Sequence, residues 1–381
     1  MEWKEVTLGD FMQCNPKRTI KKGQKARKIT MDLLIPHSKT IRNWNYEPYS
    51  GGAKFQNGDT IMARITPCLE NGKHAFVSIL DEGEIAYGST EYFVFCGKEN
   101  VSDDDFVYYL TKTPLFRESA IKSMVGSSGR QRAQMDVLEN LQMLVPKDIT
   151  DQRRIASILS SLDWKIELNN KINADLEEMA QAIFKNWFVD FEPFKDGKFV
   201  KSELGMIPEG WKVGCLGDIA EITSGKRPPK KSKDKTKELF IPLIGASDIM
   251  GFTSDVLYER PILVIGRVGT HGVVQRFQEK CWPSDNTLVI ESRYYNYVYQ
   301  LLKGIDYSAI NRGSTQPLIT QTDVKNTDVI IAPENVLKEY ESITSTLFSK
   351  HRANIKENSR LSTLRDTLLP RLMSGELEVP E

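Results

Sequence analysis

The sequence of 381 residues has few cysteines and few histidines, and neither type is clustered. Its five cysteines lie far apart and form no C-x-x-C pair, which argues against a disulfide framework and against a zinc knuckle. The four histidines are equally scattered. We therefore expect no metal ion and no other cofactor.

Long apolar runs are also missing. No run approaches the roughly 18 residues of a membrane span, and the mean hydropathy is −0.39. The N-terminal residues Met1–Glu5 have neither the basic nor the apolar region of a secretory signal. At about 150 residues per domain the chain should fold into roughly two or three domains. We expect it in the cytoplasm, with no membrane association.

A net charge is lacking, because 51 Lys and Arg residues are balanced by 51 Asp and Glu residues. The distribution is nevertheless uneven. Residues 11–54 include ten basic and two acidic residues, and seven of the ten fall within 17–28. Residues 226–237 include seven basic residues and one acidic residue. A single basic run is typical of a solvated loop, so one run alone would indicate little.

An internal repeat relates the two halves of the chain. The segment WKEVTLGD at 3–10 recurs as WKVGCLGD at 211–218, an offset of 208. Motifs within 126–146 recur within 313–333 at an offset of 187, so the second copy is about twenty residues shorter in its middle. The apolar positions that follow recur at an offset of 188. Each half therefore holds a mixed globular part followed by a helix.

Both globular parts have apolar runs typical of short strands, with one helical pattern each. The order of the strands is not specified by these patterns. In the first part the strands are expected at 60–65, 75–80, 92–96 and 141–145, with a helical pattern at 105–125 that Pro114 interrupts. In the second part they are expected at 261–268, 286–291 and 327–332, with a helix at 294–303.

Two long amphipathic helices are the clearest feature of the sequence. From Asp151 to near Phe191, apolar residues recur three and four positions apart without Pro or Gly. The pattern returns at 340–369 and should stop around Pro370 and Gly375. At about 1.5 Å per residue the first helix would span roughly 55 to 60 Å. The simplest partner for so long an apolar stripe is its own repeat copy, and the alternative is that each helix packs on its own globular part.

A pseudo-twofold relation between the halves would make the helices antiparallel and place the globular parts at opposite ends of the pair. The predicted fold class is therefore α+β, with two mixed α/β domains separated by two long antiparallel coiled-coil-like helices. Asn170 and Asn358 occupy equivalent places near the apolar stripes. They would set the register if they lay in the seam, and the sequence equally allows both to be exposed.

Motifs of an enzyme that acts alone are missing. Ser224-Gly225-Lys226 lacks the upstream glycine of a phosphate-binding loop, and the glycine-rich stretch 266–272 lacks the start of a dinucleotide fingerprint. Asp285 with Glu291 matches a metal-dependent nuclease pattern poorly, and the chain has no Asn-Pro-Pro-aromatic motif for adenine methylation. We therefore predict a non-catalytic protein.

The two basic runs begin seven or eight residues after the repeated Leu-Gly-Asp, which favours a common target contacted twice. Lys and Arg neutralise phosphates, and Arg, Asn and Gln pair with base edges. Two solvated loops are the alternative. The candidate DNA-binding residues are Lys17, Arg18, Lys21, Lys22, Lys25, Arg27, Lys28, Arg42, Asn43, Arg64, Arg130, Arg132, Lys226, Arg227, Lys230, Lys231, Lys233, Arg267, Arg312 and Gln316.

Aromatic residues of the first long helix are candidates for binding a protein partner. They offer more aromatic surface than one helix seam needs, although all of them would equally suit a core. The four residues are Trp164, Phe184, Trp187 and Phe188.

Four motifs resemble the specificity subunit of type I restriction-modification systems, and the resemblance covers essentially the whole chain. The motifs are QRRIASIL at 152–159 with Leu162-Asp163, WFVDF at 187–191, SELGMIPEGW at 202–211 and LLPRLMSGE at 368–376. The resemblance implies a first target-recognition domain at 1–150, a central conserved helix at 151–192, a linker with a second target-recognition domain at 193–333, and a C-terminal conserved helix at 334–381.

The same resemblance implies a function without catalysis. Such a subunit would bind a bipartite site in double-stranded DNA, with one half-site per recognition domain and the spacing set by the helix pair. It would recruit two methylation subunits and, in the full complex, restriction subunits. The alternatives are a scaffold that binds DNA without sequence preference and a DNA-modifying enzyme that acts alone.

Overall fold

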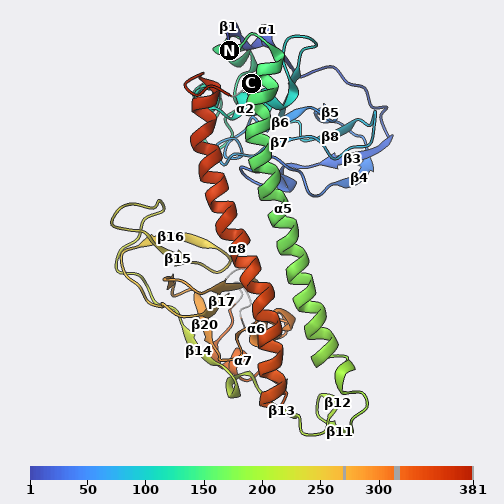
Figure 1. Cartoon of the computed structure of the whole chain (residues 1–381), viewed down its shortest axis with the longest axis vertical. Coiled ribbons are helices and arrows are strands. Elements are labelled where there is room, and N and C mark those ends of the chain that lie inside the picture. The colour runs from blue at the N-terminus through green and yellow to red at the C-terminus, as the bar shows by residue number, and fades with distance from the viewer. Residues whose placement is uncertain (269–271, 313–317, 380–381) are drawn as a thin grey trace. The chain divides into compact units, whose positions relative to one another are not determined.

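The computed structural model describes residues 1–268, 272–312 and 318–379 (Figure 1). The chain forms two compact units. Unit 1 comprises Met1–Lys171 and Asn354–Glu381, and unit 2 comprises Ile172–Ala353. Each unit therefore contains one globular part and a portion of both long helices. Within the described residues, no helix is both long and apolar enough to cross a membrane.

The globular part of unit 1 contains three small sheets and several short helices. The sheets are β1 (Trp3–Thr7) with β10 (Gln142–Pro146); then β2 (Met12–Cys14), β9 (Tyr92–Gly97), β6 (Thr60–Ala63) and β7 (His74–Phe76) in that order; and β4 (Asn45–Pro48), β3 (Lys25–Ile29), β8 (Ala86–Gly88) and β5 (Lys54–Phe55). The helices are α1 (Leu8–Phe11), η1 (Met31–Leu33), α2 (Asp104–Lys112), α3 (Pro114–Lys122) and α4 (Met135–Glu139).

Unit 2 is built from the same kinds of elements. Its sheets are β13 (Lys212–Cys215) with β21 (Asp328–Ile331); β14 (Glu221–Ser224), β20 (Thr287–Glu291), β17 (Ile262–Gly266) and β18 (Val274–Phe277) in that order; β16 (Ile249–Thr253), β15 (Ile241–Ile244) and β19 (Trp282–Pro283); and the hairpin β11 (Phe199–Ser202) with β12 (Gly205–Pro208). Its short helices are η2 (Glu192–Phe194), η3 (Leu216–Asp218), α6 (Tyr295–Gly304) and α7 (Gln321–Lys325).

The sheet β2-β9-β6-β7 of unit 1 and the sheet β14-β20-β17-β18 of unit 2 have the same topology. In both sheets the strand that comes last in the chain lies beside the strand that comes first. Their registers match as well. Ala63 pairs with Tyr92 in unit 1, and Gly266 pairs with Thr287 in unit 2. Arg64 and Arg267, the residues that follow β6 and β17, therefore occupy corresponding positions in the two sheets.

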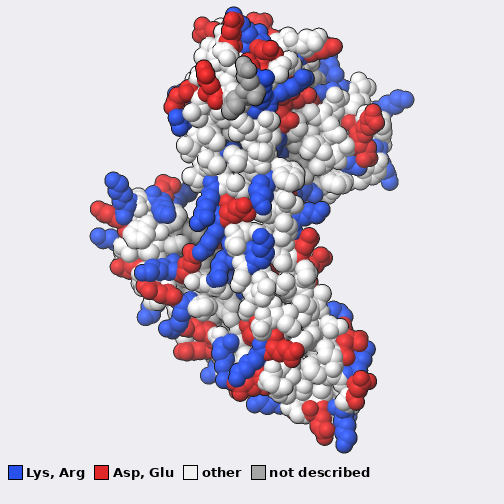
Figure 2. Space-filling view, viewed as in Figure 1, with Lys and Arg blue, Asp and Glu red and all other residues white. Residues whose placement is uncertain are grey.

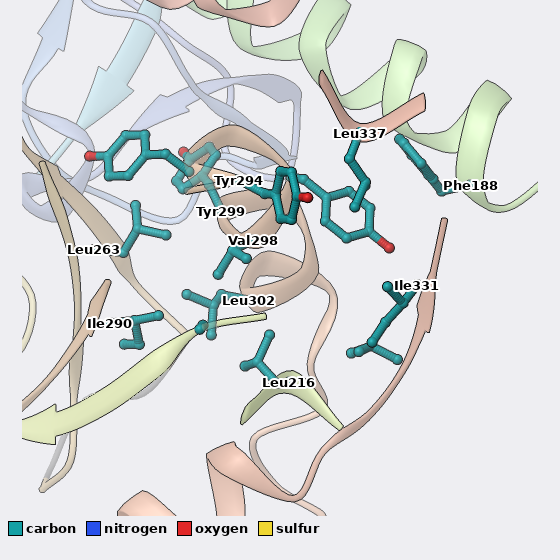
Figure 3. Packing of buried hydrophobic residues seen from close by; sticks show 14 of the residues in the cluster. Phe188, Leu216, Leu263, Ile290, Tyr294, Val298, Tyr299, Leu302, Ile331 and Leu337 are labelled. Carbon is teal, nitrogen blue, oxygen red and sulfur yellow. The ribbon is translucent and has the colours of Figure 1, made fainter. Parts of the chain in front are cut away.

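Each unit has its own hydrophobic core, to which the long helices contribute. In unit 1, Ile155 and Leu159 of α5 (Ile149–Phe188) pack in one cluster with Phe106 of α2 and Phe95 of β9. In unit 2, Phe188 packs with α6 and with the start of α8 (Glu334–Met373). Figure 3 shows the Phe188 side chain entering this cluster from α5. The packing of each helix on a globular part, considered above as an alternative, is thus present in both units.

The long helices also contact each other. In unit 1, Asn169 Nδ2 donates to Asn358 Oδ1 at 2.9 Å, and Asn358 Nδ2 donates to Asn170 Oδ1 at 2.9 Å. The Arg365 guanidinium forms an ion pair with the Asp163 carboxylate, and both side chains are buried. Residue numbers thus rise along α5 as they fall along α8. The asparagines therefore contact one another between the helices, which decides between the two possibilities that the sequence allowed.

Most differences from the expected elements lie at their ends. Helix α5 ends at Phe188 rather than near Phe191, which has a φ of 54°. Helix α8 continues through Pro370 to Met373, and Gly375 with a φ of 77° follows. A proline inside a helix removes one hydrogen bond and its ring crowds the carbonyl four residues earlier, and α8 continues for only three residues beyond Pro370. The strand expected at 75–80 covers only His74–Phe76.

Candidate nucleic-acid interface

The first basic segment, residues 17–28, connects β2 to β3 and extends into β3. Lys17, Lys21, Lys22 and Lys25 are exposed, and the described residues provide no ion pair for any of them. Four exposed ammonium groups without an acidic partner suit the phosphates of a nucleic acid. These four lysines are the candidates that remain available for an external anion.

The other three basic residues of the first basic segment form ion pairs within unit 1. Arg18 forms an ion pair with buried Asp59, and burial raises the pKa of Asp59 although Arg18 donates hydrogen bonds to it. Arg27 Nη2 lies 2.9 Å from the Asp81 carboxylate. Lys28 Nζ lies 2.7 Å from Glu47 on the neighbouring strand β4. Arg18, Arg27 and Lys28 are therefore held by the fold, in contrast to the four lysines without an acidic partner.

Arg42 and Asn43 follow η1 on the way to β4. Arg42 donates two hydrogen bonds to Glu167 of α5, at 3.0 and 2.9 Å. Burial opposes ionisation of Glu167, but the bonds from Arg42 and Thr40 outweigh it and lower the pKa of Glu167. Arg42 is thus engaged with α5, whereas Asn43 is exposed and has no described hydrogen-bond partner for its side chain.

Arg64 and Arg132 meet at Glu91, which precedes β9. Arg64 Nε lies 3.1 Å from Glu91 Oε2, and Arg132 Nη2 lies 2.7 Å from Glu91 Oε1. Hydrogen bonds from Arg132 and Arg64 overcome the effect of burial and lower the pKa of Glu91. A carboxylate that holds two guanidinium groups fixes their orientation, as the recognition of a base edge requires. Arg130, in the adjoining loop, is exposed and has no described ion pair.

The second basic segment, residues 226–237, connects β14 to β15 and lies beside β16 in Figure 1. Its base is fixed: Lys226 N donates to Pro283 O at 3.0 Å, and Trp282 Nε1 donates to Lys226 O at 2.7 Å. Further along, Ser232 and Phe252 of β16 exchange backbone hydrogen bonds of 2.9 and 2.8 Å.

The cations of the second basic segment are displayed to solvent. Figure 2 shows Lys and Arg side chains around the part of unit 2 that holds β15 and β16. No ion pair is described for the five candidates of this segment, all of which are exposed: Lys226, Arg227, Lys230, Lys231 and Lys233. This segment is therefore even more available to an external anion than the first.

The remaining candidates of unit 2 differ in their surroundings. Arg267 N donates to Asn286 O at 2.9 Å, as Arg64 N donates to Glu91 O at 3.0 Å in unit 1. Where unit 1 has a glutamate, unit 2 therefore has Asn286. Arg312 forms an ion pair with Asp323. Gln316 lies outside the described residues.

The structure separates the four aromatic candidates of α5. Trp164 is 66% exposed and borders a shallow hollow of about 400 Å³ in unit 1. Phe188 is buried in the core of unit 2, with its ring centroid 4.6 Å from that of Tyr297. Phe184 and Trp187 are half-buried against the same core. Trp164 is thus the one of the four whose side chain is largely presented to solvent.

Residues 284–286 adjoin the second basic segment, but the sequence did not mark them as binding residues. Ser284, Asp285 and Asn286 line a hollow of about 390 Å³ together with Arg227 and Lys231. The internal repeat could have pointed to these residues, because aligning β9 with β20 places Asn286 opposite Glu91. That alignment requires the strand registers, which the sequence patterns do not provide. Among the described residues, no group of three or more His, Cys, Asp or Glu side chains is arranged to hold a metal ion.

The family model of the type I restriction modification DNA specificity domain matches residues 1–178 and 208–360. The MjaIX specificity subunit of a type I restriction enzyme from Methanocaldococcus jannaschii is 32% identical, over 90% of this chain and 86% of its own length. The HindI specificity subunit from Haemophilus influenzae is 25% identical, over 99% of this chain and 100% of its own length.

The fold is also similar to that of a solved structure. The S subunit of a type I restriction-modification system from M. genitalium aligns with a TM-score of 0.57 at 16% identity, covering 98% of this chain and 96% of that one. At this identity the likeness concerns the fold alone. The family model, which covers most of the sequence, and the full-length relatives carry the assignment. The chain therefore belongs to the type I restriction-modification specificity family, whose specificity subunits are non-catalytic.

Proposed function

We propose that this chain recognises the DNA sequence for a type I restriction-modification complex by binding a bipartite site, one half-site to each unit. One observation carries the proposal. In both units an exposed basic segment follows the first strand of a four-stranded sheet with the same topology, β2 in unit 1 and β14 in unit 2. Two cationic segments at corresponding places suit two stretches of the same polyanion.

The half-sites should differ in sequence. Phosphate contacts position a protein on DNA, whereas base contacts specify sequence. The residues next to the matching arginines differ, since Glu91 accompanies Arg64 and Asn286 accompanies Arg267. Unlike side chains at corresponding positions favour unlike base pairs.

The long helices are proposed to set the spacing between the half-sites. Each helix has 40 residues, about 60 Å at 1.5 Å per residue. Asn170 and Asn358 are repeat equivalents that contact each other, as expected for residues close to a pseudo-twofold axis. We infer an antiparallel coiled-coil-like pair between two target-recognition domains, with the domain limits stated above.

Partner subunits supply the chemistry that this chain lacks. We propose that two methylation subunits dock on the long helices and adjoining surfaces, with restriction subunits joining the full complex in the cytoplasm. Trp164 is the strongest candidate contact, because a large exposed aromatic side chain beside a shallow hollow is typical of an interface residue. A Trp164→Ala chain that remains folded should no longer co-purify with the methylation subunit.

Selection from random duplexes, with the methylation subunit present, tests the proposal. Bound duplexes should contain two short, unlike half-sites separated by a constant length of arbitrary sequence. One continuous motif would refute the bipartite arrangement. Equal recovery of all sequences would instead favour a scaffold without sequence preference, and methylation by this chain alone would indicate an enzyme.

A further inference from the structure

A hollow in unit 2 combines cationic, apolar and hydrogen-bonding groups. We name it the Ser284 hollow; its volume is about 390 Å³. It is lined by Arg227, Pro228, Pro229 and Lys231 of the second basic segment, Leu243 of β15, Met250 of β16, and Ser284, Asp285 and Asn286 between β19 and β20.

Backbone hydrogen bonds fix the wall that carries Ser284. Ser284 N donates to Ile244 O at 3.0 Å, and Thr287 donates to Ser284 O through both its backbone N, at 3.0 Å, and its hydroxyl, at 2.7 Å. Gly225 closes the back of this wall, since a Cβ atom there would lie 2.1 Å from Ser284 O. The positions of residues 284–286 are therefore set by the fold before any ligand binds, which favours specific recognition.

The polar side chains of this wall are unused by the fold. Ser284 is 2% exposed, and its hydroxyl has no hydrogen-bond partner among the described residues. The Ser284 hydroxyl is enclosed within this wall, so Asp285 and Asn286 supply the polar side chains that a ligand in the hollow can reach. Asp285 and Asn286 are exposed, and the described residues provide no partner for either side chain.

The carboxylate of Asp285 restricts what the hollow can accept. It lies among cations that suit phosphates, yet by itself it repels a phosphate backbone and weakens non-specific binding. Such a group is favourable on a DNA-binding surface only when it meets a hydrogen-bond donor. In the major groove, cytosine and adenine offer an exocyclic amino group, whereas guanine and thymine offer acceptors at the corresponding place.

We propose that the Ser284 hollow reads one base pair of the half-site bound by unit 2, with Asp285 as the specificity-determining residue. Its carboxylate accepts a hydrogen bond from the exocyclic amino group of cytosine or adenine. Arg227 and Lys231 hold the adjoining phosphates, and Met250, whose side chain is exposed, provides an apolar surface for the base edge. The inference rests on the proposed function and names the chemistry that distinguishes unit 2.

Unit 1 has no equivalent group. The matching strand registers place Thr90 opposite Asp285 and Glu91 opposite Asn286. Glu91 is neutralised by Arg64 and Arg132, so it is not available to a base amino group. The requirement for an amino-bearing base should therefore apply to the half-site of unit 2 alone.

Duplex selection on the complex with the methylation subunit tests the inference, comparing the wild-type chain with Asp285→Ala. One position of the second half-site should admit only cytosine or adenine on one strand, with guanine or thymine bound at least roughly five-fold more weakly in the wild type. Asp285→Ala removes the acceptor and should reduce this discrimination to below about two-fold, strengthen binding to random duplexes, and leave the first half-site unchanged. Asp255→Ala is the matched control, because Asp255 is exposed and has no described ion pair.

A second variant distinguishes recognition from a structural role. Asp285→Asn keeps an oxygen acceptor without the charge, so it should retain the preference for an amino-bearing base while binding random duplexes more strongly. If Asp285→Asn instead loses half-site selection as Asp285→Ala does and both variants lose stability, Asp285 has a structural role and the inference is overturned. If Asp285→Ala keeps the wild-type preference at every position, the inference fails although the proposed function stands. If the wild-type complex selects no half-sites, the proposed function fails and the inference with it.

Discussion

The lysines of the first basic segment allow a quantitative test, because the structure separates those that lack acidic partners from those held in ion pairs. Lys21, Lys22 and Lys25 are exposed and outside every described ion pair. Replacing all three by Ala therefore removes positive charge without leaving a buried carboxylate unpaired. The fold should be unaffected, and any loss should appear in DNA binding.

The expected size follows from counterion release. Each phosphate contact contributes about 0.9 to the slope of log K against log salt, so three lost contacts should reduce the slope by about 2.7. When the salt concentration rises fourfold, for instance from about 50 to 200 mM, the affinity of both chains falls, and the fold-decrease should be about 40 times smaller for the variant than for the wild-type chain. Phosphate contacts carry no sequence information, so the preference among half-sites should stay the same.

The assay is a titration of one fixed duplex at several salt concentrations. The control replaces Lys198, Lys201 and Lys212, which are equally exposed and also lack a described ion pair, but lie outside both basic segments. This control should retain the wild-type slope. If the segment variant keeps the wild-type slope as well, the first basic segment is a solvated loop and not a phosphate-binding surface.

Three further predictions concern the frame that carries these segments. Burial lowers the pKa of Lys112 from 10.5 to about 8, so the free energy of unfolding of unit 1 falls as the pH falls from 10.5 through 8. Replacing Lys112 by Met removes this cost and should stabilise unit 1 at pH 7 by at most about 3 kcal/mol. Urea titrations should show that the gain vanishes above pH 10.5. Arg365→Met leaves the buried Asp163 carboxylate without its cation, with the Tyr109 hydroxyl still donating to it at 2.7 Å, and should cost unit 1 about 3 to 5 kcal/mol. Adding Asp163→Leu removes the buried charge and should recover part of this loss, although Tyr109 then lacks its acceptor; equal losses in both variants would refute the pairing argument. Inserting seven residues after Ala174 and seven after Ala353 lengthens both helices by about 10 Å and nearly preserves the direction of their apolar faces. The preferred spacer between the half-sites should then grow by about three base pairs. An unchanged spacer in a folded variant would show that the helices do not set the spacing.

Periodicity was enough to predict the helices. The spacing of Ile155 and Leu159 indicated a buried stripe, and both are buried in unit 1. A periodic pattern of this length identifies a helix, but it does not fix the residue at which the helix ends. The ends depend on the backbone conformation of single residues near Phe191 and Pro370. Strands with few apolar residues were missed, as for β4 (Asn45–Pro48), because short polar segments depend on pairing with neighbours rather than on their own pattern.

The candidate site was predictable only in part. Runs of basic residues are visible in a sequence, but the acids that neutralise some of them are not. Asp59 is 41 positions from Arg18, and only the folded chain brings them together. Lys25–Ile29 belongs to strand β3 rather than to a loop, with Ala26 and Ile29 buried. Asp285 was noticed only as a poor metal ligand, since its relation to the second basic segment depends on sheet register.

The most direct test of the central claim is a genome-wide map of methylated bases in a host without other methylation, co-expressing this chain with its methylation subunit. The account predicts that methylation depends on this chain and falls within one bipartite motif of two unlike half-sites with a constant spacer. Exchanging the second basic segment and residues 284–286 for those of a relative should change the second half-site only. Methylation in a single continuous motif, or methylation that persists unchanged without this chain, would contradict it.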